Sequence, residues 1–234
     1  MRDFSVEMSC DASGAVQAAR KGYIVVVVDV ISMSTTIEAA LEEGALAVFG
    51  ASPDQARAPV FLNPEKIGYD AGILARKKGT ELIMVAEPRV GSKKDRITAS
   101  SLAFRGVQQS GAADPLVLPN LGADTVKMAN FKGRVVLAVT GSGGVAFDAV
   151  YNAGGTVLTA TIARTMKMKG HVPALVGAKR VLCEARKKKT GISVVAASSQ
   201  SLEDVLAACY IRDFIKELMS QDLIINYPVR HKYE

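Results

Sequence analysis

Hydrophobic residues along this chain alternate between short continuous runs and stretches with helical spacing. The runs, rich in valine and isoleucine, predict β-strands at residues 24–28, 45–49, 81–85, 134–139, 156–160 and 192–196. The stretches between them predict helices at residues 35–43, 67–78, 98–109, 123–130, 145–152, 174–189 and 201–219. Strands that alternate with helices predict an α/β fold, a three-layer sandwich with a parallel or mixed central sheet. No repeat or linker divides the sequence, so we expect one domain over residues 1–234.

The first predicted strand ends in the segment with the most informative chemistry. Asp29 follows the buried run, and Ser34, Thr35 and Thr36 stand at the start of the next helix. Open α/β sheets bind ligands at the carboxyl ends of their strands. An aspartate, hydroxyl groups and free helix amides at that place can bind a metal ion and a phosphate together. The alternative is structural: Asp29 ends the strand, and Ser34 or Thr35 caps the helix.

Two further predicted strands end in loops suited to anions. After residues 81–85 come Glu87, Arg89, Lys93 and Lys94, which give this loop one carboxylate and several cations. The turn after residues 134–139 consists of Thr140, Gly141, Ser142, Gly143 and Gly144. Small residues there allow backbone amides to close on an anion, although the turn lacks the lysine of a P-loop. Surface loops of this composition are also ordinary.

The last predicted helix begins with a second group of carboxylates. Ser201, followed three residues later by Asp204, fits a capping box, which explains both residues without any chemistry. Glu203 has no such structural explanation. We therefore treat Glu203 as a candidate catalytic residue and prefer a capping role for Ser201 and Asp204.

Composition narrows the function classes. The net charge of +6 comes largely from residues 186–189, and cations in the last turn of a helix before a glycine favour a solvated helix end over a nucleic-acid site. Aromatic residues make up only 6% of the chain, which argues against a surface that stacks on bases. No run of apolar residues reaches the length of a membrane span. Three scattered cysteines without metal-ligand spacing indicate a reduced, cytoplasmic protein.

Five segments between residues 20 and 220 share their order with the motifs of a known enzyme family. They are Asp29-Val30-Ile31 with Ser34-Thr35-Thr36, Glu87 before a glycine-containing loop, Asn120-Leu121-Gly122, Thr140-Gly141-Ser142-Gly143, and Ser201-Leu202-Glu203-Asp204. In this order and at this spacing they resemble the motifs of the 2-phosphosulfolactate phosphatase family. The shared order is much more specific than any one segment.

The chain departs from that family at positions suited to binding anions. Ser32 stands where the opening motif has arginine, and Thr161 stands where the family has asparagine. The turn from Thr140 lacks the family's asparagine and contains one extra residue. Arg89 follows Glu87 one position later than the Gly-Glu-Arg element requires, so an arginine has shifted along the chain. Serine cannot reproduce the two-pronged contact of arginine with a phosphate or sulfonate.

The resemblance implies a magnesium-dependent hydrolase that releases phosphate from 2-phosphosulfolactate, a step towards coenzyme M in methane-producing archaea. It implies Mg²⁺ on Asp29 and Glu87, and catalytic roles for Asp29, Glu87 and Glu203. The substrate-binding residues would be Ser34, Thr35, Thr36, Arg89, Thr140, Gly141, Ser142 and Gly143. The partner would be a small anionic phosphate ester, with no nucleic acid or membrane, and a homo-oligomer stays open. A second hypothesis is a non-catalytic, anion-binding or regulatory homologue that keeps the fold.

Overall fold

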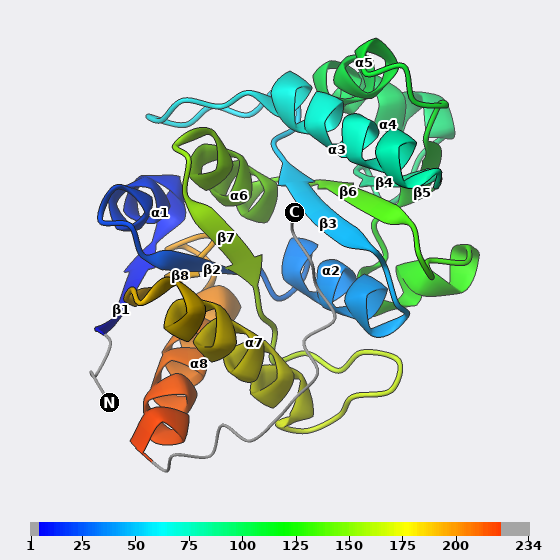
Figure 1. Cartoon of the computed structure of the whole chain (residues 1–234). Coiled ribbons are helices and arrows are strands. Elements are labelled where there is room, and N and C mark those ends of the chain that lie inside the picture. Colours follow the sequence, from blue (N-terminus) through cyan, green and yellow to red (C-terminus); the bar gives the residue numbers. More distant parts are fainter. Residues whose placement is uncertain (1–4, 221–234) are drawn as a thin grey trace.

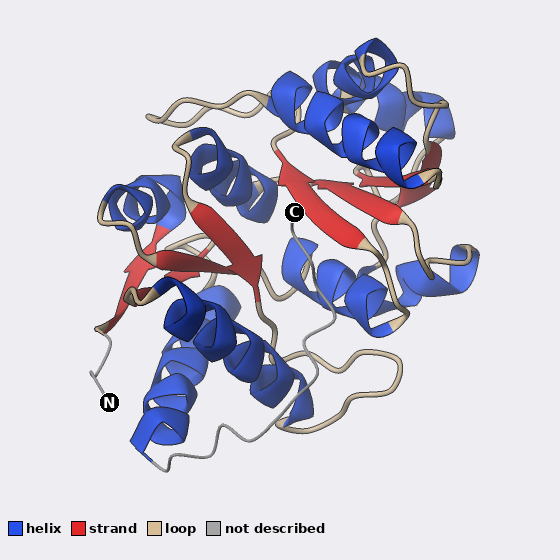
Figure 2. Ribbon diagram, in the orientation of Figure 1, coloured by secondary structure: helices blue, strands red, loops and turns tan. Residues whose placement is uncertain are grey.

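The computed structural model describes residues 5–220 and shows two parallel β-sheets (Figure 2). The first sheet has the order β1-β8-β2-β7, with β1 (Val6–Cys10), β2 (Ile24–Val28), β7 (Thr156–Thr159) and β8 (Ile192–Ala196). The second sheet has the order β3-β6-β4-β5, with β3 (Ala47–Ala51), β4 (Leu82–Ala86), β5 (Leu116–Pro119) and β6 (Val135–Val139). Every pairing within the two sheets is parallel. The predicted α/β class with parallel strands is confirmed.

Helices cover both faces of each sheet, and one helical layer lies between the sheets (Figure 1). The inner layer contains α1 (Asp11–Arg20), α2 (Met33–Glu42) and α6 (Ser142–Asn152), with the 3₁₀ helix η1 (Gly122–Met128) beside α2. The outer face of the first sheet carries α7 (Val172–Lys188) and α8 (Leu202–Ser220). The outer face of the second carries α3 (Pro64–Lys78), α4 (Lys93–Ala99) and α5 (Ser101–Gln109). Each sheet is therefore the centre of an α/β/α sandwich, and the two sandwiches share their inner helices.

Strand β2 shows why its sequence is a continuous apolar run. Val25 and Val27 pack against the inner helices, whereas Val26 and Val28 pack against α7 and α8. All five residues of the strand are buried. Because both faces of this strand are covered, neither alternate position can be polar.

The predicted elements differ from the structure where local signals were weak. Strands β2 and β8 have the predicted bounds, but the helix expected at 98–109 is two helices that meet at Ser100. The helix expected at 123–130 is the 3₁₀ helix η1. Strand β1, helix α1 and strand β5 were not predicted. The residues of β1 are only partly buried, α1 begins directly after it at a residue with positive φ, and β5 is four residues long and ends in proline.

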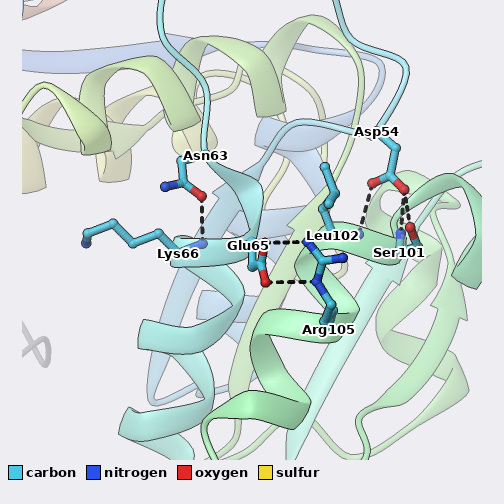
Figure 3. Close-up of polar contacts among 7 residues, drawn as sticks. All are labelled: Asp54, Asn63, Glu65, Lys66, Ser101, Leu102 and Arg105. Carbon is cyan, nitrogen blue, oxygen red and sulfur yellow. Dashed lines mark hydrogen bonds and ion pairs between the residues drawn. The ribbon is translucent and has the colours of Figure 1, made fainter.

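The loop between β3 and α3 is fastened to the outer helices by side chains that cap them (Figure 3). The Asp54 carboxylate accepts hydrogen bonds from the Ser101 and Leu102 amides (3.0 and 3.1 Å) and from the Ser101 hydroxyl, so it caps α5 from a distant part of the chain. Asn63 accepts a hydrogen bond from the Lys66 amide (3.0 Å) and caps α3. These contacts hold the loop without any contribution from its own secondary structure.

A buried ion pair connects the inner and outer helices around the edge strand β7. Arg180 of α7 pairs with Glu38 of α2, and the two side chains are 10% and 1% exposed. The Thr159 hydroxyl donates to Glu38 Oε1 (2.7 Å), and Arg180 Nη2 donates to the Thr159 carbonyl (2.7 Å). The pair thereby ties α2, α7 and the end of β7 together.

A bilayer-crossing helix would have to be both long and strongly apolar, and none within residues 5–220 meets that description.

Candidate functional site

Asp29 lies at the carboxyl end of β2 and joins the two sheets through hydrogen bonds. The Ser32 amide donates to its Oδ1 (3.0 Å), and the Gly143 amide donates to its Oδ2 (3.0 Å). Ser32 precedes α2, whereas Gly143 lies in the first turn of α6, which follows β6 of the other sheet. The side chain is 5% exposed. The Asp29 carboxylate thus accepts hydrogen bonds at the amino ends of two helices, one that follows a strand of the first sheet and one that follows a strand of the second. The dipoles of both helices favour negative charge there.

Two opposing effects act on the ionisation of Asp29. Burial raises its pKa above the ordinary value because the charged form loses its hydration. Hydrogen bonds from the Ser32, Met33 and Gly143 amides, and the charge of Arg89, act in the opposite direction and are the smaller contribution. The backbone donors therefore offset part of the cost of ionising this buried carboxyl group.

The three predicted hydroxyl ligands are buried, and each makes hydrogen bonds inside the protein. The Ser34 hydroxyl donates to the Val27 carbonyl (2.9 Å) and accepts from the Asp29 amide (2.8 Å). Thr35 Oγ1 lies 2.8 Å from Thr161 Oγ1, at the end of β7. These hydroxyls hold the segment from Asp29 to Thr36, which we call the Asp29 segment, in one conformation.

Thr36 connects the Asp29 segment to the second sheet. Its hydroxyl donates to Asn120 Oδ1 (2.6 Å), and Asn120 Nδ2 donates to Glu87 Oε1 (3.4 Å). Asn120 directly follows β5 and Glu87 directly follows β4. The ends of both strands therefore reach the same place as the end of β2, as we expected for Glu87 and Asp29. Asn120 itself was not predicted as a site residue, since β5 had not been recognised.

Arg89 reaches the Asp29 segment from the loop after β4. Its Nη2 donates to the Ile31 carbonyl (2.6 Å) and to the Ser32 hydroxyl (3.3 Å), while the side chain stays largely exposed. The buried Arg96 fixes this loop by donating to the carbonyls of Pro88 and Gly91 (2.9 and 3.0 Å). A guanidinium thus stands beside Ser32 with part of its donor set open to solvent.

The two lysines of this loop stand further along the chain than Arg89. Lys93 begins α4 and lines a hollow with Glu81 and Leu116, at the amino ends of β4 and β5. Lys94 is exposed in the same turn of α4. Among the cations of the loop, Arg89 is the one bonded to the Asp29 segment.

The turn after β6 is stabilised from within. The Gly144 amide donates to the Thr140 hydroxyl (3.0 Å), and the Gly143 amide donates to Asp29. The amides of Gly141 and Ser142 take no part in these contacts, and Ser142 is exposed. Any anion bound by this turn would meet those two amides first.

At the start of α8, the structure shows only part of the capping box that we predicted for Ser201 and Asp204. The Asp204 amide donates to the Ser201 hydroxyl (3.3 Å), which is one half of a capping box. The other half is absent, because Asp204 Oδ1 accepts a hydrogen bond from the Val30 amide (2.9 Å) in the Asp29 segment. Glu203 is exposed on the first turn of α8. Asp204 is thus the carboxylate of α8 that contacts the Asp29 segment.

The position of Asp204 predicts a pH dependence of stability. Burial raises the pKa of Asp204 to about 6, and the charges of Asp29 and Glu203 act in the same direction. The folded protein therefore binds this proton more tightly than the unfolded chain, whose aspartate titrates near 3.8. This group's contribution to the free energy of unfolding falls as the pH rises from about 4 to about 6, and it is constant above that range.

Asp204→Asn tests this pH dependence, because its amide oxygen can still accept from Val30 but the side chain cannot ionise. Relative to wild type, the variant is expected to gain stability between pH 4.5 and pH 7.5 in urea unfolding. The exposed Glu203→Gln is the matched control and should follow wild type at both pH values. Equal pH dependence in wild type and Asp204→Asn would contradict the assignment.

The carboxylates near the Asp29 segment can be compared with the ligands that the predicted Mg²⁺ ion requires. Within residues 5–220, no group of three or more His, Cys, Asp or Glu side chains is arranged to hold a metal ion. Glu87 is linked through Asn120 to Thr36, whose hydroxyl also lies 3.0 Å from the Ser32 carbonyl, and the Ser32 amide bonds to Asp29. Mg²⁺ commonly takes one or two carboxylates and completes its shell with water and substrate phosphate. Two carboxylates are the number of protein ligands that such an ion commonly takes, so Asp29 and Glu87 stay the candidate ligands.

Searches with this chain matched no model of a known protein family and no curated protein.

Proposed function

We propose that the site around Asp29 binds and hydrolyses a small anionic phosphate monoester with the help of Mg²⁺. The observation that carries the proposal is the meeting of strand ends from both sheets at the Asp29 segment. There, the Asp29 carboxylate accepts hydrogen bonds from the amino ends of two helices, Arg89 donates to the Ile31 carbonyl, and Glu87 is linked to Thr36 through Asn120. Helix amino ends and arginine are the groups that best stabilise a phosphoryl group in transfer.

Each group has a role that follows from its chemistry. The carboxylates of Asp29 and Glu87 would hold Mg²⁺. When bound, this ion would stabilise the negative charge of the phosphoryl oxygens and lower the pKa of a water bound to it. Arg89 would contact the phosphate directly through its solvent-exposed nitrogens, and the Gly141 and Ser142 amides would add donors from the turn. Ser34, Thr35 and Thr36 would keep the Asp29 segment rigid, while Asp204 would hold Val30. Glu203 stays a candidate for a second acid or base.

The family resemblance names 2-phosphosulfolactate as the first substrate to test. Arg89 supports the resemblance at its weakest point, since its guanidinium lies beside Ser32, where the family has arginine. A shifted arginine can thereby supply the charge that Ser32 lacks. We further propose a cytoplasmic location, in keeping with cysteines that are all free thiols in the described residues, and small molecules rather than nucleic acid or membrane as partners.

Arg89→Ala is expected to weaken binding of a phosphate dianion by at least about tenfold, because a charge-assisted hydrogen bond contributes roughly 1.5–3 kcal/mol. Calorimetry with 2-phosphosulfolactate and with inorganic phosphate measures the loss. The matched control is Arg57→Ala, an exposed arginine whose hydrogen bonds lie within its own loop. Equal affinities for wild type and Arg89→Ala would exclude Arg89 from the site.

A panel of phosphate monoesters, assayed with and without Mg²⁺, tests the reaction. Release of phosphate that requires Mg²⁺ and is lost in Arg89→Ala supports the phosphatase. Dianion binding with no phosphate release from any ester would favour the second hypothesis, a non-catalytic anion-binding homologue. One observation favours that hypothesis: both carboxylate oxygens of Asp29 already accept backbone hydrogen bonds, which leaves fewer lone pairs for a metal or a water.

A further inference from the structure

Several large hydrophobic side chains are exposed in the Asp29 segment or close in the chain to residues bonded to it, among them Ile31, Leu121, Ile162 and Leu202. Ile31 is 53% exposed, Leu121 44%, Ile162 36% and Leu202 67%. They come from four different connections, after β2, β5, β7 and β8 respectively. We call these four residues the apolar rim.

Each residue of the apolar rim is placed beside the Asp29 segment by a neighbour in the chain. Ile31 belongs to the segment, and Leu121 follows Asn120, which accepts from Thr36. Ile162 follows Thr161, whose hydroxyl contacts Thr35. Leu202 lies two residues before Asp204, which accepts from Val30. The four residues therefore come from distant parts of the sequence and belong to the Asp29 segment or stand one or two positions from a residue bonded to it.

The composition of this rim is unusual for a site that takes only a fully polar anion. Single exposed hydrophobic residues are normal on protein surfaces, but several around one site mark a binding surface. Leu116 offers the contrast, because it lies at the opposite end of β5 from Leu121 and is similarly exposed (41%). At that end of the strand Leu116 neighbours Lys93, Glu81 and Asp114.

We propose that the apolar rim contacts the organic group of the substrate, so that the preferred ligand is a phosphate monoester with an apolar alkyl or aryl group, taken from solution. The inference rests on the proposed function of the same site. Arg89 and the amides of the α6 turn would bind the phosphate, while the rim covers the hydrocarbon. Each methylene removed from water by such a rim lowers the dissociation constant by up to about fourfold.

Calorimetry with methyl, butyl and hexyl phosphate tests the inference on the full-length wild type, on Leu121→Ser and on Leu116→Ser. We expect hexyl phosphate to bind wild type at least about 30-fold more tightly than methyl phosphate. Leu121→Ser should lower the affinity for hexyl phosphate by about threefold or more and leave methyl phosphate unchanged. Leu116→Ser, the matched control at the other end of β5, should behave as wild type with both esters.

The outcomes separate this inference from the proposed function. Methyl and hexyl phosphate binding equally, or 2-phosphosulfolactate binding more tightly than hexyl phosphate, would overturn the apolar substrate and leave the phosphate site standing. Failure of every ester to bind would overturn both. Analytical ultracentrifugation of the same samples tests whether a second copy of the chain covers the rim instead. A wild-type dimer that dissociates in Leu121→Ser would assign the rim to that second copy and overturn the inference.

Discussion

Gly143→Ala is expected to lose about a hundredfold or more of the activity or anion affinity of the site, together with about 1–3 kcal/mol of stability. A Cβ atom at this position would lie 2.2 Å from Asp29 Oδ2 and 2.8 Å from the Cβ atoms of Asp29 and Met33. These neighbours are buried and cannot move aside, so α6 or the Asp29 carboxylate must shift. Either shift breaks the hydrogen bond between the Gly143 amide and Asp29.

Gly141→Ala is the matched control for Gly143→Ala. Gly141 lies two residues earlier in the same turn, has a negative φ, and a Cβ there would meet no atom within 4 Å. This variant should keep most of its activity and lose at most about 1 kcal/mol, because alanine is a poorer N-cap than glycine. Activity and urea unfolding measure both variants. If Gly143→Ala matched Gly141→Ala in both measurements, close packing of α6 on Asp29 would not matter for the site.

Glu38→Ala is expected to lower the free energy of unfolding by about 3–5 kcal/mol, the largest stability effect that we predict. The substitution leaves the guanidinium of Arg180 buried without its carboxylate and removes the acceptor of the Thr159 hydroxyl. Removing one partner of a buried ion pair costs far more than the lost attraction itself, because the remaining charge stays buried. Urea unfolding followed by circular dichroism measures the change.

The double variant Glu38→Met with Arg180→Met separates the two contributions. With both charges gone, no ion is left buried, so this variant should be clearly more stable than Glu38→Ala. Lys21→Ala, which breaks an exposed ion pair with Glu7, should change stability by no more than about 1 kcal/mol. A loss of that small size in Glu38→Ala would mean that water reaches the pair.

The secondary structure could be predicted for segments whose own residue pattern reflects their burial. Strands β2 and β8 are buried on both faces, so short runs rich in valine and isoleucine gave their bounds. Strand β1 at the edge of the first sheet is only partly buried, and its mixed residues carry no such signal. The division into two sheets was also beyond the sequence, because strand pairing depends on contacts between distant residues.

Some of the predicted site residues contact one another, but the directions of their side chains were not predicted. Gly143 contacts Asp29, and Glu87 contacts Asn120, which bonds to Thr36 of the Asp29 segment, because these residues follow parallel strands or begin the helices after them. The side-chain directions could not be deduced: the hydroxyls of Ser34 and Thr35 bond inside the protein, and Asp204 accepts a hydrogen bond from the Val30 amide. The hydrogen-bond partner of each side chain depends on which groups the tertiary packing brings within about 3 Å of it.

The order of the strands also determines when each part of the protein can form during synthesis. All strands of the second sheet lie between residues 47 and 139, so that sheet is complete once this stretch has left the ribosome. Strand β2 must wait, since its two neighbours are β7 and β8, at the far end of the chain. At about 5–20 residues per second, the most apolar strand remains unpaired for roughly seven to twenty-six seconds before β7 has been made. Nascent chains of this protein are therefore expected to need a chaperone at β2 until β8 emerges.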